Sequence, residues 1–149
     1  MVNPRTGFPF SNPRDNPGYL LWQVTMRWQR LMNQALTPHE LTHTQFVLLA
    51  ALKWLSGEQD IVTKSDVARH ANVDRIMAAK ILRDLARRKI ISERPHPTRG
   101  HAQAVSLTNE GGIIFGDALD TVGNTDRLFF GDKFVQSVTL LNQLLPEDN

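Results

Sequence analysis

The chain has 149 residues, no cysteine and a formal net charge of +2 at neutral pH. Its length predicts one domain with a substantial hydrophobic core, and the lack of cysteine excludes disulfides and thiol-based redox sensing. An apolar run of the roughly 18 residues needed for a transmembrane helix is absent, and residues 1–16 lack a signal-peptide layout. We therefore expect a soluble, cytoplasmic protein.

Residues 1–15 are predicted to form a flexible arm, because proline recurs there among asparagine, glycine and arginine. Asn16 followed by Pro17 predicts the start of a helix that continues to about residue 37. The helix is apolar on two faces, one with Leu20, Val24, Trp28 and Leu31 and the other with Trp22 and Met26. Such a helix needs to bury both faces.

The next segment, residues 39–43, reads H-E-L-T-H and matches the H-E-x-x-H pattern of zinc metalloproteases. Zinc binding by this pattern requires one continuous helix across the five residues. Thr42, however, is predicted to be the N-cap of the following helix, which would interrupt the pattern. That helix is predicted over residues 44–55 and is expected to stop at Ser56-Gly57. We therefore expect no enzyme, no catalytic residue, no metal and no cofactor, and interpret both histidines as polar surface residues on a connecting turn. A zinc-dependent hydrolase and a non-catalytic zinc site using His39 and His43 stay open as alternatives.

Two helices separated by a short turn follow. Thr63 and Asp66 form a helix-start signal for residues 63–71, and Asp74 predicts the cap of a second helix over about residues 75–88. The second helix is amphipathic, with Ala78, Ile81, Leu82 and Leu85 on one face and Ile76, Lys80, Arg83 and Arg87 on the other. This arrangement predicts a helix-turn-helix.

A basic-tipped hairpin is predicted directly after these helices. Residues 90–94 and 102–107 are interpreted as strands, with Gln103, Val105 and Leu107 alternating. The intervening residues 95–101 combine turn formers with cations, including Arg99 and His101. Ile61-Val62 is a candidate for a small strand beside this hairpin. The fold class predicted is therefore mainly α with a small β-hairpin wing.

Positive charge is concentrated in the predicted motif. Residues 63–101 hold ten Lys or Arg against four Asp or Glu, a balance of +6, while the other residues hold seven against eleven, a balance of −4. Locally concentrated positive charge is what phosphate binding requires. Ile76 lies among these cations, where it could touch a thymine methyl. The alternatives are a solvated basic face and a winged helix that binds protein.

The remaining chain predicts two further helices. Thr108 caps the first, whose glycines favour a bend near Gly123, and residues 129–132 interrupt the chain. A final helix with Phe134, Val138, Leu141 and Leu145 ends before Pro146.

The chain resembles the MarR family of bacterial transcription regulators over about residues 17–145. The resemblance rests on the order and spacing of short motifs: L-T-H-T-Q-F at 41–46, S-D-V-A at 65–68, V-D-R at 73–75, L-R-D-L at 82–85, I-I at 90–91, R-P at 94–95 and V-S-L-T-N-E-G at 105–111. Two positions depart from the family pattern. Lys89 stands where the family usually has glycine in a left-handed turn, and the wing has Arg99 and His101 where the family has Asp and Arg.

The resemblance implies a homodimeric winged helix-turn-helix repressor that binds an inverted-repeat operator. Residues 16–149 would form one domain, in which 16–37 and 108–149 supply the N- and C-terminal dimerisation helices and 61–107 the DNA-binding winged helix. The implied DNA-binding residues are Lys64, Ser65, Arg75, Ile76, Met77, Ala79, Lys80, Arg83, Arg87, Arg99 and His101. Family members often release DNA on binding small aromatic molecules, for which Trp22, Met26 and Trp54 are the candidate pocket residues.

Overall fold

A computed structural model describes residues 2–147, which are mostly helical. The α-helices in this part of the chain are α1 (Pro17–Leu36), α2 (His43–Glu58), α3 (Lys64–Ala71), α4 (Arg75–Arg87), α5 (Asn109–Phe130) and α6 (Phe134–Leu144). Strands β1 (Ile91–Pro95) and β2 (Gln103–Leu107) form an antiparallel hairpin between α4 and α5. Short 3-10 helices lie at Pro13–Asp15, Thr37–His39 and Gly131–Lys133. The predicted fold class, mainly α with a β-hairpin, is confirmed.

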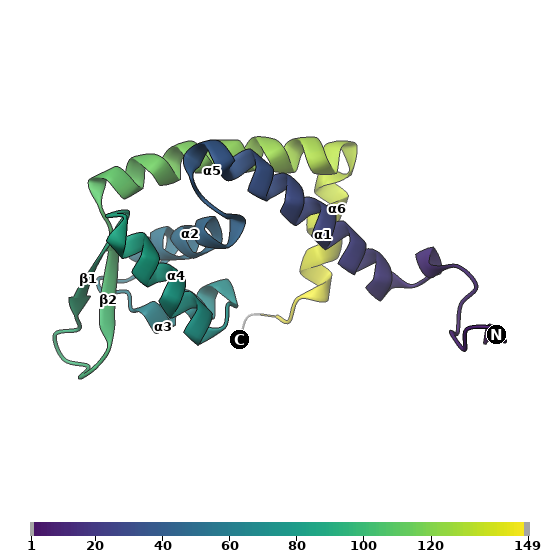
Figure 1. Cartoon of the computed structure of the whole chain (residues 1–149), viewed down its shortest axis with the longest axis horizontal. Coiled ribbons are helices and arrows are strands. Elements are labelled where there is room, and N and C mark those ends of the chain that lie inside the picture. Colours follow the sequence, from purple (N-terminus) through teal and green to yellow (C-terminus); the bar gives the residue numbers. More distant parts are fainter. Residues whose placement is uncertain (1, 148–149) are drawn as a thin grey trace.

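The helices form a lobe and an elongated extension (Figure 1). The lobe contains α2, α3, α4 and the hairpin, while α5 and α1 run from it toward the opposite end of the molecule and α6 descends from the far end of α5. Buried side chains of α1 to α5 and both strands make one hydrophobic core. No residue of α6 is buried. The long helices thus extend beyond the core that supports the lobe.

Side-chain caps determine where most of these helices begin. Asn16, Thr42, Thr63, Asp74 and Thr108 each accept a hydrogen bond from a backbone N–H in the first turn of the helix that follows. Thr42 and Thr63 both complete a capping box, with Gln45 and Asp66 respectively. The helix starts predicted at these residues are confirmed.

The hairpin is anchored to the lobe by the segment before α3. Ile91 pairs with Leu107 and Pro95 with Gln103. The Val105 N–H donates to the Val62 carbonyl at 2.8 Å, and Thr63 forms one bridge with Ala104. The small strand predicted at residues 61–62 is therefore absent, and the segment contributes only the bridge at Thr63. The strand predicted over residues 102–107 is confirmed as β2, in which the adjacent residues Ala104 and Val105 are both buried.

Three further predictions from local sequence are wrong. Helix α2 does not stop at Ser56-Gly57 but continues to Glu58, and the backbone bonding reaches the C-cap, where the Gln59 N–H donates to the Leu55 carbonyl at 2.9 Å. Helix α5 is unbroken through Gly123, since Phe115, Ala118 and Val122 pack it on the core. His43 is buried rather than on the surface.

Candidate nucleic-acid interface

Helix α4 presents two chemically distinct faces. Ala78, Leu82 and Leu85 are fully buried and fix the helix on the lobe. The opposite face carries exposed cations and an apolar residue, Ile76, which is 82% exposed. Asp74 caps the helix by accepting from the Met77 N–H at 2.9 Å. The amphipathic pattern predicted for residues 75–88 is confirmed.

The turn before α4 sets its angle to α3. Asn72 ends α3 in the left-handed conformation, with φ of 53°, a geometry that asparagine tolerates better than most residues. The Val73 N–H then donates to the Ala68 carbonyl at 3.0 Å. Two helices joined in this way form a helix-turn-helix, with α4 as the second helix.

The start of α3 lies beside the hairpin. The Asp66 carboxylate accepts from the Thr63 N–H at 2.9 Å and the Thr63 hydroxyl accepts from the Asp66 N–H at 3.1 Å. Burial raises the pKa of Asp66, but hydrogen bonds from Thr63 and Gln59 and the charge of Arg69 outweigh it and hold that pKa below its usual value. The capping charge therefore persists at neutral pH, and it fixes the two half-buried residues that follow Thr63, Lys64 and Ser65.

The wing tip is ordered by a histidine. The Nδ1 atom of His96 accepts the backbone N–H groups of Thr98 and Arg99 at 3.1 and 3.0 Å, and Gly100 has a φ of 46°. This turn leaves Arg99 and His101 exposed at the tip. Sequence reasoning identified the cations of the tip but not the role of His96 in shaping it.

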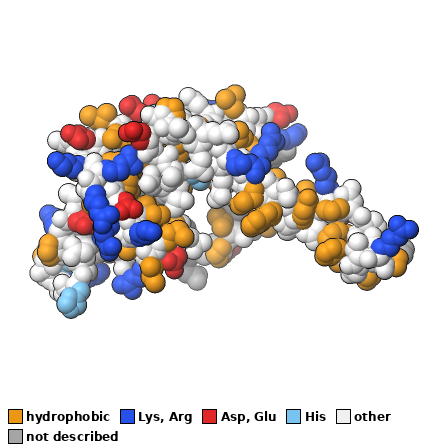
Figure 2. All heavy atoms as spheres, viewed as in Figure 1, with side chains coloured by type: hydrophobic (Ala, Val, Ile, Leu, Met, Phe, Trp, Pro, Cys, Tyr) orange, Lys and Arg blue, Asp and Glu red, His pale blue; other side chains and the backbone are white. Residues whose placement is uncertain are grey.

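Ion pairing separates the predicted DNA contacts into two groups. Lys64 forms an ion pair with Glu93 of β1, and Arg87 pairs with Asp84 at 2.9 Å. No described residue forms an ion pair with Arg75, Lys80 or Arg83. Figure 2 shows Lys and Arg side chains gathered on the lobe, with hydrophobic side chains among them. Cations without an acidic partner are available for phosphate groups.

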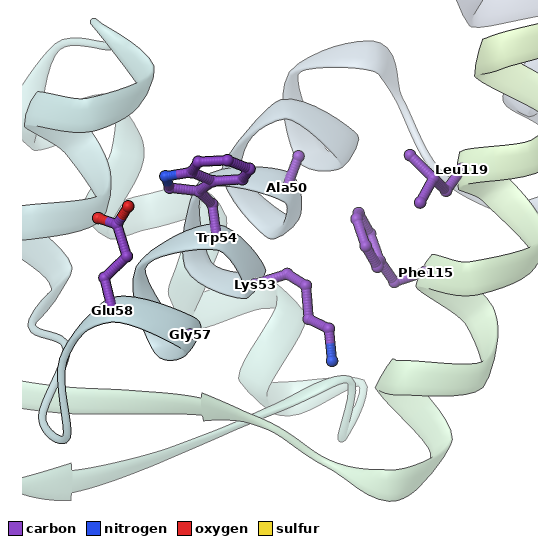
Figure 3. A pocket seen from close by; sticks show the side chains of 7 residues that line it. All are labelled: Ala50, Lys53, Trp54, Gly57, Glu58, Phe115 and Leu119. Atoms are coloured by element: carbon purple, nitrogen blue, oxygen red, sulfur yellow. The ribbon is translucent and has the colours of Figure 1, made fainter.

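A pocket lies between α2 and α5, on the side of Trp54 (Figure 3). Its volume is about 640 Å³. Figure 3 shows the Trp54 indole, the Phe115 ring and Leu119 around the hollow, with the Lys53 ammonium at the rim beside Phe115. Trp54 was predicted as a pocket residue, whereas Phe115 and Lys53 were missed. Trp22 and Met26 lie on α1 and do not line this pocket.

The H-E-x-x-H segment does not form the helix that the zinc motif needs. His39 ends a 3-10 helix, Glu40 is left-handed with φ of 55°, and His43 is the first residue of α2. The His39 Nε2 atom contacts the Thr121 hydroxyl at 2.7 Å. The predicted break at Thr42 is confirmed.

Comparison with known proteins agrees with this geometry. No protein-family model matches the chain. Over 121 residues it is 36% identical to the uncharacterized HTH-type transcriptional regulator YdcH of Bacillus subtilis (strain 168), a match that covers 81% of this chain and 82% of that protein. The chain belongs to the HTH-type transcriptional regulators.

Its fold is that of the MarR proteins, as the resemblance implied. A mutant MarR from E. coli solved with operator DNA has a TM-score of 0.76 at 23% identity, over 87% of this chain and 93% of that one. BpsR from Bordetella bronchiseptica, whose DNA binding is regulated by 6-hydroxynicotinic acid, has a TM-score of 0.75 at 24% identity, over 85% and 96%. CouR from Rhodococcus jostii RHA1, bound to p-coumaroyl-CoA, has a TM-score of 0.75 at 20% identity, over 91% and 92%. As a transcriptional regulator of this fold, the chain has α4 in the place of the recognition helix and the hairpin in that of the wing.

One further property concerns the long helices. Within residues 2–147, none of them combines the length and apolar character needed to cross a membrane.

Proposed function

We propose that the protein is a homodimeric, sequence-specific DNA-binding repressor that occupies an inverted-repeat operator. The observation that carries the proposal is the row of exposed cations on α4, Arg75, Lys80 and Arg83, which lacks acidic partners among the described residues. A helix-turn-helix places such a face in the major groove. The fold shared with operator-bound MarR supports this placement.

The proposed DNA-contacting residues, of which Lys64, Ser65 and Ala79 are half-buried and the others exposed, divide by the part of DNA that each would contact. Arg75, Ile76, Met77, Ala79 and Lys80 lie in the first half of α4, which approaches base edges. Arg83 and Arg87 lie further along α4, and Lys64 and Ser65 lie in the first turn of α3; these would contact phosphates, which position the protein without specifying sequence. Arg99 and His101 on the wing tip would approach the minor groove.

Dimerisation is proposed from the apolar surface of α1 and α6. The exposed large apolar residues of these helices are Tyr19, Leu20, Leu21, Trp22, Val24, Phe134, Val135, Val138, Leu140, Leu141 and Leu144. A groove of about 310 Å³ lies between α1, α6 and the end of α5. Contiguous apolar surface of this kind marks a protein interface, and a twofold dimer would cover the same surface on both copies.

The Trp54 pocket is the proposed effector site. Its lining is mostly apolar and aromatic, with the Lys53 ammonium near Phe115 and the Glu58 carboxylate on the other side of Trp54. A small aromatic molecule whose negative charge lies on the Lys53 side suits this lining. The 6-hydroxynicotinic acid that regulates BpsR and the p-coumaroyl-CoA bound to CouR both combine an aromatic ring with acidic groups. In the proposed mechanism, such a ligand shifts α2 and α5 relative to one another and so changes the spacing of the two recognition helices. Trp22 and Met26 do not line this pocket in the same chain, so they would contact the effector only if α1 of the second copy of the dimer reached it.

A salt-titrated binding assay with Arg83→Ala tests the DNA-binding proposal. Each phosphate contact contributes about 0.9 to the slope of log affinity against log salt, so we expect Arg83→Ala to reduce the slope by about that amount. Arg127→Ala removes an exposed arginine from α5 and should leave the slope unchanged. Binding that is absent in the unaltered protein, or independent of salt, would favour the alternative of a winged helix that contacts protein.

A further inference from the structure

Two apolar side chains in the first turn of α4 have no packing role in the described fold. Ile76 is 82% exposed and Met77 is 53% exposed. Neither belongs to the hydrophobic core or to the half-buried residues that pack against it. Because both side chains are exposed to water, they do not stabilise the fold through burial. Both lie in the part of a recognition helix that approaches base edges.

The composition of α4 restricts which bases it can read. The helix contains no asparagine, glutamine, serine, threonine, histidine or glutamate, so it lacks the side chains that recognise adenine. The Asp74 and Asp84 carboxylates, which could accept from cytosine, are engaged by the Met77 N–H and by Arg87. Arginine and lysine recognise guanine, and apolar side chains recognise the thymine C5-methyl group.

We propose that α4 reads thymine C5-methyl groups through Ile76 and Met77, so that each operator half-site carries thymine beneath the first turn of the helix. Lys80, one turn further along, supplies a guanine contact from the same face. This inference rests on the proposed function and specifies the base chemistry of its DNA site. It makes the two apolar residues determinants of specificity, whereas the phosphate-contacting Arg83 and Arg87 determine affinity.

The test removes single methyl groups from DNA. The full-length protein first selects its preferred duplex from a random-sequence pool, and each thymine of that duplex is then replaced in turn by uracil, which differs only by the C5-methyl group. We expect uracil to lower the affinity about fivefold at one or two positions per half-site. This loss lies at the low end of the range for a disrupted base contact. Thymines flanking the selected site serve as controls.

The same duplexes are then bound to Ile76→Ala and Met77→Ala. If these side chains contact the methyl groups, the uracil penalty at the corresponding position disappears in one of the variants, while binding to unrelated DNA is unchanged. Both residues are exposed, so the melting temperatures should match the unaltered protein. A selected site in which no uracil substitution weakens binding, or a penalty that persists in both variants, overturns the inference and leaves the proposed function intact. Failure to select any sequence overturns both.

Discussion

The Lys64 ammonium and the Glu93 carboxylate form an ion pair that joins the first turn of α3 to β1 of the wing. Their side chains are only 17% and 27% exposed. Lys64 was predicted to contact a phosphate, yet in the free protein its charge is already balanced. The pair therefore links the wing to the helix-turn-helix, and under the proposed function it would compete with DNA for the lysine.

Removal of the acidic partner should strengthen DNA binding. In Glu93→Gln, Lys64 is released for a phosphate and a negative charge near the DNA is lost, so we expect tighter binding and a salt slope steeper by about 0.9. Asp120→Asn makes the same charge change on the exposed surface of α5 and should alter neither quantity. An unchanged slope in Glu93→Gln would show that the ion pair does not withhold Lys64 from a phosphate.

Assembly can be tested on α6, which has no buried residue in the single chain. Leu141 lines the groove between α1 and α6. In Leu141→Glu a dimer would have to bury a carboxylate without a partner, so we expect a monomer at micromolar concentration by sedimentation and much weaker operator binding. Ile113→Glu changes an exposed residue of α5 at the opposite end and should remain dimeric. A stable monomer in the unaltered protein would contradict the proposed assembly.

Local signals and long-range contacts differ in how well the sequence predicts them. Helix starts at Thr63, Asp74 and Thr108 were predictable because a cap and its partner lie within one turn. The wing and the basic face of α4 followed from strand and helix periodicity. By contrast, His43 is buried against Trp28, and the Trp54 pocket is closed on its second side by Phe115. Both of these neighbours are distant in sequence from the residues that they contact. Nothing in the local pattern identifies those neighbours.

Gly111 and Gly112 are neighbours in sequence but differ in their long-range contacts, so they give a matched pair of variants. A Cβ atom at Gly111 would lie 1.9 Å from the Ile90 carbonyl oxygen, whereas at Gly112 no atom lies within 4 Å. We expect Gly111→Ala to lower the free energy of unfolding by about 2 kcal/mol or more, because backbone has to move. Gly112→Ala should raise it by up to about 1 kcal/mol through helix propensity. Denaturant unfolding measures both, and similar values for the two variants would disprove the proposed close approach.

Lys89 lies two residues beyond the end of α4 and is left-handed, with φ of 60°. The family usually has glycine here, and a side chain at positive φ costs backbone energy. We expect Lys89→Gly to raise the free energy of unfolding by about 0.5–1 kcal/mol, after the greater flexibility of glycine in the unfolded chain is included. Arg88, with φ of −79°, provides the control, since Arg88→Gly should only destabilise. A destabilised Lys89→Gly would show that other contacts of the lysine outweigh the strain.

His43 should make stability depend on pH. Its ring meets the Trp28 ring edge-on, with centroids 4.7 Å apart. Burial lowers the pKa of His43, and the nearby Asp126 charge only partly opposes this shift. Because the unfolded chain then binds a proton more readily than the folded one, the stability that neutral His43 contributes is fully present above about pH 6.5, the ordinary value, and is lost as the pH falls below it.

The measurement is the free energy of unfolding between pH 5 and 7.5. We expect it to fall toward pH 5 with a His43 contribution of at most about 1.4 kcal/mol per pH unit. His43→Gln should be less stable at pH 7.5, because it loses the contact with Trp28, but should show a shallower decline. His70 is exposed, so His70→Gln should keep the original slope. An equally steep decline in His43→Gln would place the titration elsewhere, whereas a shallower one would show that His43 takes up its proton more readily in the unfolded chain than in the fold.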